Sequence, residues 1–200
     1  VEAAAALLES LDHRVDATYP AALDETNLGE WVGTSVSSSV ARELDAYAEM
    51  TGDEVEEADV EPATWAMAQR GRSLSASDYL KTIDALHGYG RRLRGWWREL
   101  PGEDGYDILV TPTMAEPAPP IGSVKGADID RIVRLVPYTM AYNVSGQPAI
   151  GLPLHWTAEG LPMGVQLVGC YGSESLLIRL SSQLEEAMPW RERRPAIYSA

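Results

Sequence analysis

Hydrophobic side chains recur at helical intervals in several long segments of the chain. The clearest helix is predicted over 75–100, where Tyr79, Ile83, Leu86 and Leu93 share one face and the apolar positions continue to Trp97 and Leu100. Ser75 and Asp78 have the spacing of a capping box at its start. A second amphipathic helix is predicted over 173–187, beginning at Ser173. The same periodicity predicts helices over 1–10, from about 22 to 50, and from Pro62 to Gly71.

Three other segments have the patterns of strands. The continuous apolar run within 107–113 predicts a covered core strand, and 149–169 predicts a hairpin with Gly160 in its turn. Residues 11–18 alternate between apolar and polar and predict a further strand. Strands separated by helices indicate an α/β chain with a mixed β-sheet covered by helices. The prediction is of one incomplete domain over 1–200.

One face of the predicted hairpin carries unusually small residues. Gly151 and Gly164 leave room for a close backbone or side-chain neighbour. Nothing in the sequence obviously supplies that neighbour, so we expect an element outside the chain to do so.

Charge narrows the range of partners. The net charge is −14 and the run 52–61 is strongly acidic, which disfavours direct contact with nucleic acid or an anionic membrane surface. No apolar run is long enough to span a bilayer. The single cysteine, Cys170, together with the lack of a signal-peptide pattern, favours a cytoplasmic protein, and the preference for arginine over lysine favours a bacterial one. The first residues read as the middle of a helix in a longer polypeptide.

The sequence contains few motifs that indicate a metal, cofactor or catalytic site. His13, His87 and His155 are too dispersed to predict a metal site, and no motif indicates a cofactor. Lys81 and Lys125 have no serine–lysine context, and a triad of Ser145, His155 and Asp107 has no supporting motif. We therefore expect no metal, no cofactor and no catalytic group within the chain.

An ordered set of motifs resembles the C-terminal half of amidase signature enzymes. The set comprises DHRVDATYPA (12–21), GRSLSASDYL (71–80), DILVTPT (107–113), YNVSGQPAIGLPL (142–154), GLPMGVQLVG (160–169) and PWRERRP (189–195). The resemblance implies hydrolysis of a carboxamide through an acyl-enzyme, with a serine nucleophile, a second serine on a cis peptide bond and a lysine base. The glycine- and serine-rich loop that carries these serines in the family is absent. The nearest string, GTSVSSS, places Ser37, Ser38 and Ser39 in a predicted helix.

The resemblance therefore implies the C-terminal portion of an amidase whose catalytic residues lie upstream. It also implies that Thr139 and Asn143 line the substrate pocket. From the residues alone, Asn143 fits a functional loop and a helix cap equally well. The implied partners are a small-molecule amide and the missing N-terminal half, with a homodimer as a further option. Two alternatives remain open, a non-catalytic structural or binding module and the amidase subunit of a tRNA-dependent amidotransferase.

Overall fold

The computed structural model describes residues 1–97, 105–123, 131 and 134–194. The chain divides into two compact units. Unit 1 comprises Val1–Pro20, Arg94–Ala118 and Val136–Ala200, and unit 2 comprises Ala21–Leu93 and Pro119–Leu135. Each unit is described by itself, and a single incomplete domain over 1–200 stays a prediction.

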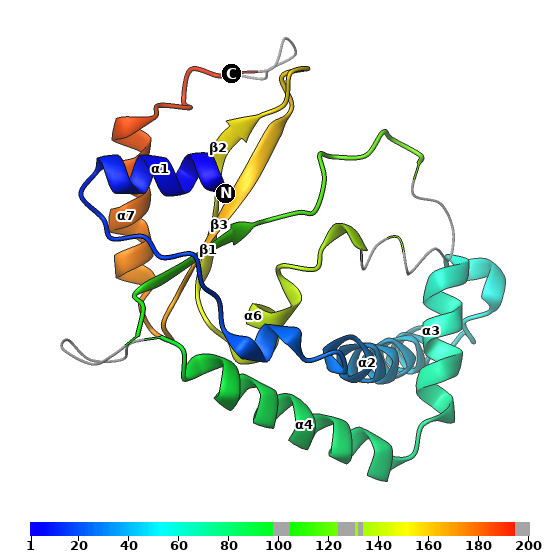
Figure 1. Ribbon diagram of the computed structural model, residues 1–200. Coiled ribbons are helices and arrows are strands. Elements are labelled where there is room, and N and C mark those ends of the chain that lie inside the picture. The colour runs from blue at the N-terminus through cyan, green and yellow to red at the C-terminus, as the bar shows by residue number, and fades with distance from the viewer. Residues whose placement is uncertain (98–104, 124–130, 132–133, 195–200) are drawn as a thin grey trace. The chain divides into compact units, whose positions relative to one another are not determined.

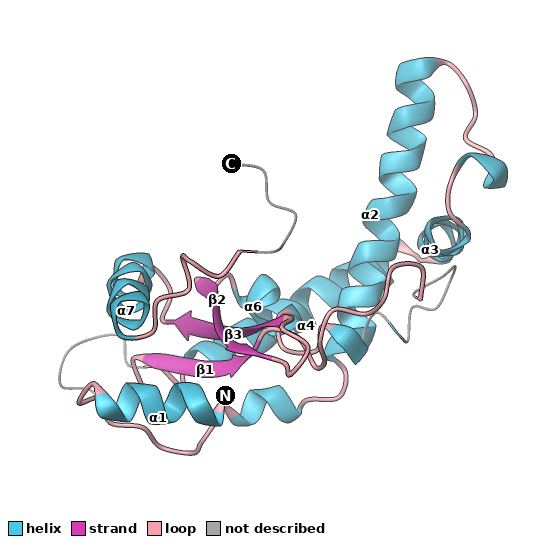
Figure 2. Cartoon of the chain, turned by 90° about the horizontal axis from the view of Figure 1, so that it is seen from above, coloured by secondary structure: helices cyan, strands magenta, loops and turns pink. Residues whose placement is uncertain are grey.

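Unit 1 is built on a three-stranded sheet with the order β1-β3-β2. The strands are β1 (Ile108–Pro112), β2 (Ala149–Trp156) and β3 (Pro162–Gly169), and Figure 2 shows β1 at one edge. β2 and β3 form the predicted hairpin, whose turn places Gly160 at φ +85°. These elements confirm the α/β class.

The sheet departs from the mixed sheet that the sequence predicted. β1 and β2 run in the same direction, but β3 lies between them, so both ladders are antiparallel. The one parallel pairing among the described residues is an isolated bridge between Trp97 and Tyr106.

Two helices cover one face of this sheet. They are α1 (Glu2–Ser10) and α7 (Glu174–Ala187), whose N-cap is Ser173 (Figure 1). Their apolar stripes meet the inward face of the hairpin in one core. The buried members of that core are Ala4, Leu8, Leu152, Leu154, Val165, Leu167, Leu177, Leu180 and Leu184. Alternation along the strands places these side chains on one face and leaves the small residues on the other.

The neighbour of these small residues comes from within the chain, whereas the sequence analysis expected an element outside it. Thr113 follows β1, and its backbone N–H donates to the carbonyl of Gly164 at 3.0 Å. A Cβ built on Gly164 would lie 2.7 Å from the Thr113 Oγ1 atom, whereas one on Gly151 would lie 3.5 Å from the same atom. The Thr113 side chain therefore lies directly against Gly164, while Gly151, at an ordinary contact distance from it, is exposed.

The segment 11–18 also differs from its prediction, because it forms no strand. It runs from α1 past β1 as irregular backbone, and no described strand pairs with it. A period of two predicts a ladder only where a neighbouring strand exists.

Unit 2 is helical, and its described residues include two 3₁₀ turns, η1 (Ala21–Asp24) and η2 (Glu57–Asp59). They also include the helices α2 (Leu28–Thr51), α3 (Pro62–Ser73) and α4 (Ala76–Arg94). α2 ends at Gly52 in the left-handed conformation, and α3 begins with Pro62 in its first turn, as predicted. Gly71 of α3 lies directly against the backbone of Ser37 in α2, where a Cβ would overlap the carbonyl.

The start of α4 is fixed by its capping box, while its end differs from the prediction. The Ser75 hydroxyl accepts from the Asp78 N–H at 3.1 Å, and an Asp78 oxygen accepts from the Ser75 N–H at 3.2 Å. The Ser75 hydroxyl, which donates to the Asp78 carboxylate at 2.6 Å, and the Ser75 N–H hold the pKa of Asp78 below its usual value. The helix ends at Arg94, so Trp97 lies beyond it, and the rest of the predicted helix at 98–100 lies outside the described residues.

Candidate functional site

The predicted pocket residues Thr139 and Asn143 lie on a short helix, α6 (Met140–Ser145). Thr139 is the N-cap of α6, and the Asn143 N–H donates to the Thr139 carbonyl at 3.3 Å. Residues four apart lie on the same side of a helix, and the Thr139 hydroxyl donates to the Val136 carbonyl at 3.4 Å. Asn143 is exposed, whereas Ala141 and Tyr142 are buried. The structure therefore places the two predicted residues one helical turn apart, with Thr139 half-buried and Asn143 exposed.

The position of Asn143 bears on one of its two interpretations, as a helix cap or as part of a functional loop. Asn143 lies inside α6, and the helix ends at Gly146, whose φ is +71°. Gly146 therefore turns the chain at the end of α6, and Asn143 does not cap the helix. A role for Asn143 in substrate binding stays a prediction.

Two buried glutamines hold the segment around α6 against the sheet. Gln166 of β3 donates from Nε2 to the Tyr138 carbonyl at 2.9 Å and to Thr111 Oγ1 at 3.1 Å. Gln147, just after α6, donates from Nε2 to the Gly169 carbonyl at 3.0 Å and accepts from the Ser145 hydroxyl. Buried amides with satisfied partners fix geometry because any shift leaves a polar group unpaired. Sequence reasoning did not single out Gln166, although a polar residue inside the apolar run of β3 was a signal.

Aromatic side chains also hold α6 against the same side of the sheet. Trp97 is buried and donates its indole N–H to the Val168 carbonyl at 3.1 Å. The Tyr142 ring meets the Trp97 ring edge-on, with centroids 6.5 Å apart. Trp97 thereby packs against the inner side of α6.

The nucleophile and base candidates are not brought into a catalytic arrangement. Ser37 is buried in α2, and Ser38 and Ser39 donate back to the carbonyls of Thr34 and Ser35 within the same helix. Lys81 is exposed on α4. Lys125 lies outside the described residues.

Other titratable groups lie apart from one another or have structural partners within the described residues. His13 bonds to Gln183 at 2.9 Å, and no group of metal-ligating side chains occurs within the part of the chain that the structure describes. Burial, with the negative charge of Glu25, raises the pKa of Tyr89 to about 12, so this hydroxyl stays protonated at neutral pH.

No described helix is both long enough and apolar enough to cross a bilayer.

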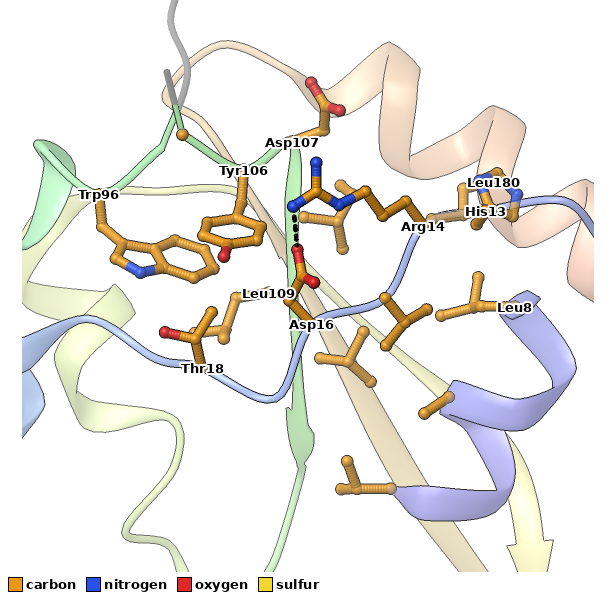
Figure 3. A pocket seen from close by; sticks show the side chains of 16 residues that line it. Leu8, His13, Arg14, Asp16, Thr18, Trp96, Tyr106, Asp107, Leu109 and Leu180 are labelled. Atoms are coloured by element: carbon orange, nitrogen blue, oxygen red, sulfur yellow. Dashed lines mark ion pairs between the residues drawn. The ribbon is translucent and has the colours of Figure 1, made fainter.

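A groove with a volume of about 590 Å³ lies along the outer edge of β1 (Figure 3). One wall is the backbone from Gly105 to Val110, and the opposite wall is the segment His13–Thr18. At one end of the groove the Trp96 ring stacks on the Tyr106 ring, with centroids 4.4 Å apart. Arg14 and Asp16, which also line the groove, form an ion pair at 3.0 Å. Leu8 and Leu180 supply apolar lining. Sequence reasoning missed this groove because it lies between segments far apart in the chain.

Comparison with known proteins identifies the family. The sequence model of the amidase family matches residues 1–178. The 6-aminohexanoate-cyclic-dimer hydrolase of Pseudomonas sp. (strain NK87) is 36% identical over 205 residues, which cover 97% of this chain and 41% of that protein. A putative amidase AmiC of Mycobacterium leprae (strain TN) is 43% identical over 89 residues, covering 42% of this chain and 19% of the relative.

Solved structures agree with these relationships. The 6-aminohexanoate cyclic dimer hydrolase in complex with its substrate superimposes with a TM-score of 0.88 at 35% identity, covering 98% of this chain and 42% of that one. A bacterial aryl acylamidase shares the fold at 20% identity with a TM-score of 0.71, covering 97% of this chain and 41% of that one. The chain thus spans about two fifths of the length of the cyclic-dimer hydrolases that it matches. On the match over residues 1–178 and the identity over nearly its whole length, the chain belongs to the amidase signature family.

Proposed function

We propose that this chain is the C-terminal portion of an amidase that hydrolyses a small-molecule carboxamide, with its catalytic residues upstream of residue 1. The observation that carries the proposal is the identity of 36% with a cyclic-dimer hydrolase across 97% of the chain, which occupies only 41% of that enzyme. The back-bonded serines of α2 and the exposed Lys81 support a catalytic group outside the chain.

The proposed reaction follows the chemistry of the family resemblance. A serine oxygen attacks the amide carbon, and its proton passes through the second serine to the neutral lysine amine. The tetrahedral intermediate collapses, the C–N bond breaks, and the leaving amine takes the proton. Water then attacks the ester, releasing the carboxylic acid and restoring the serine. Backbone N–H groups of the signature loop stabilise the oxyanion in both steps.

This chain would contribute a wall of the substrate pocket. Thr139 and Asn143 offer a hydroxyl and a neutral carboxamide on one face of α6, and these groups can hydrogen-bond to an amide substrate without adding charge. Gln166 and Gln147 would act as positioning residues, because they hold the segment that carries this face. The amide named in the cyclic-dimer hydrolases is the first substrate to assay.

A chimera provides the test. The segment of the 6-aminohexanoate-cyclic-dimer hydrolase of Paenarthrobacter ureafaciens that aligns with this chain at 35% identity is replaced by this chain. The chimera and the 200-residue chain are then assayed on the cyclic dimer and on a panel of aryl amides. We expect hydrolysis of at least one amide by the chimera and none by the chain alone. A folded but inactive chimera would favour a non-catalytic structural module.

Variants on α6 test the pocket wall. Asn143→Ala in an active chimera should raise KM or lower kcat, while Glu185→Ala, an exposed change on α7, should leave both unchanged. Equal kinetic constants for all three proteins would remove Asn143 from the substrate site.

A further inference from the structure

Trp97 lies beyond the end of α4 at Arg94 and is nevertheless buried, so contacts outside that helix hold it. Its indole N–H donates to the Val168 carbonyl of β3 at 3.1 Å, and its backbone forms an isolated parallel bridge with Tyr106. The Trp96 ring meets the Trp97 ring edge-on, with centroids 4.9 Å apart. The sheet and the neighbouring aromatic ring therefore restrict the indole to one orientation.

The same indole supports α6 through Tyr142. The Tyr142 side chain is buried and meets the Trp97 ring edge-on, at 6.5 Å between centroids and an interplanar angle of 89°. Tyr142 directly precedes Asn143, and the N–H groups of both residues lie 3.3 Å from the Thr139 carbonyl to which they donate. A shift of the Tyr142 ring therefore moves the backbone that carries Thr139 and Asn143.

α6 is too short to hold its own position. Its six residues make fewer than two helical turns, and isolated helices shorter than about 12–15 residues are marginal in water. Gln166 and Gln147 hold the chain on either side of α6. The contact between Trp97 and Tyr142 instead lies within the helix, so it sets how far α6 stands from the sheet to which the indole is bonded.

We propose that Trp97 is a positioning residue of the amidase, which acts through Tyr142 on the place of the pocket wall and thereby on the selection of amide substrates. The inference rests on the proposed function, because it takes Thr139 and Asn143 as that wall. Trp97 is buried, so it acts through Tyr142 rather than by contact with a substrate. A smaller side chain at position 97 leaves space into which Tyr142 moves, and α6 then draws back and gives the pocket room for larger amides.

Amide hydrogen exchange in the chimera tests the positioning without requiring activity. Trp97→Leu removes both the aromatic pair and the indole donor. The N–H groups of Asn143 and Gly146, whose hydrogen bonds form α6, should exchange about two- to tenfold faster, the range for the loss of one aromatic pair. This acceleration is measured relative to the Thr113 N–H, which donates to the Gly164 carbonyl and reports opening of the sheet.

The kinetics of an active chimera test the effect on selectivity. The substrates are aryl amides varied in size in the acyl group and, separately, in the amine. Trp97→Leu should raise kcat/KM for the larger amide relative to the smaller one by at least about twofold in one of the two series, the lower limit for side chains in contact. Trp65→Leu makes the same change at a half-buried tryptophan of α3 and should leave both ratios unchanged.

Two further variants assign the effect to the aromatic contact. Tyr142→Leu removes the other partner, so its effect on the selectivity ratio and that of Trp97→Leu should be non-additive by at least about twofold. Trp97→Phe keeps an aromatic ring and loses the indole donor, so it should fall between the parent and Trp97→Leu in both measurements. If Trp97→Leu does not fold, Trp97→Phe serves for the exchange and the kinetic comparison alike.

Each result decides the proposal. Equal acceleration at α6 and at Thr113 would overturn it, because a tryptophan with a purely structural role lowers the stability of the sheet and of α6 together. Unchanged selectivity ratios in an active chimera would also overturn it, whatever the change in exchange. Selective acceleration at α6 in an inactive chimera would support the positioning by Trp97 and contradict the proposed function.

Discussion

Replacing Gly164 by alanine tests the close approach of Thr113 to the sheet. The new Cβ would lie 2.7 Å from the Thr113 Oγ1 atom and 3.0 Å from its Cβ. Thr113 cannot withdraw easily, because its N–H donates to the Gly164 carbonyl and its β-branched side chain is stiff. Overpacking of this kind costs about 1–3 kcal/mol, partly offset by about 0.4–1 kcal/mol from the less flexible unfolded chain. We expect a net loss of about 1–2 kcal/mol in the free energy of unfolding.

Gly151 provides a matched control on the neighbouring strand. Its added Cβ would lie 3.5 Å from the same Thr113 oxygen, which is an ordinary contact. Gly151→Ala should therefore leave the stability unchanged or raise it by about 0.4–1 kcal/mol. Urea unfolding followed by circular dichroism measures both variants, with an unchanged slope as the check that the unfolding reaction is the same.

A double-mutant cycle then connects the loss to Thr113. Thr113→Ala removes Oγ1, the nearer of the two clashing atoms, so it should reduce the cost of Gly164→Ala. Equal effects of the two glycine substitutions, or strictly additive effects of Gly164→Ala and Thr113→Ala, would refute the assignment of Thr113 as the neighbour of these glycines.

Three further changes test other parts of the account. Gln166→Leu leaves the Tyr138 carbonyl without its donor, so unfolding should become easier by about 1–3 kcal/mol, and KM of an active chimera should rise. Ser75→Ala removes the α4 cap and should lower stability by about 1 kcal/mol, as measured by urea unfolding. The Arg92 guanidinium holds the pKa of Glu25 below its usual value. The stability that this ion pair contributes is fully present above the unfolded pKa of Glu25, about 4.3, and is lost as the pH falls through the lower folded pKa. Arg92→Met should therefore lose less stability than the unmodified chain between pH 6 and pH 3 in urea titrations, and equal losses would contradict the ion pair.

The elements with local signals could be predicted from the sequence. The capping box at Ser75, Pro62 in the first turn of α3 and the glycines at 52 and 160 each fix a helix or turn through its own neighbours. The apolar periods of α7 and of the hairpin predict the faces that meet in the core. In these places the local preference and the tertiary contacts agree.

Tertiary contacts decided the elements that the sequence did not predict correctly. α4 ends at Arg94, and Trp97, on the predicted helix face, bonds instead to the Val168 carbonyl. The segment 11–18 has a strand pattern without a neighbouring strand, and a ladder cannot form without one. The neighbour of the two glycines is Thr113, which the pairing of β1 with β3 places beside them. Each of these outcomes depends on residues far apart in the sequence.

Labelling with a fluorophosphonate probe tests the central claim most directly. The 200-residue chain and the chimera are treated in parallel, and the modified residue is located by peptide mass spectrometry. The account predicts stoichiometric labelling of a serine upstream of residue 1 in the chimera and no labelling of the chain alone. Labelling of Ser37, Ser38, Ser39 or Ser145 with amide turnover by the chain alone would show that it carries its own nucleophile and would contradict the account.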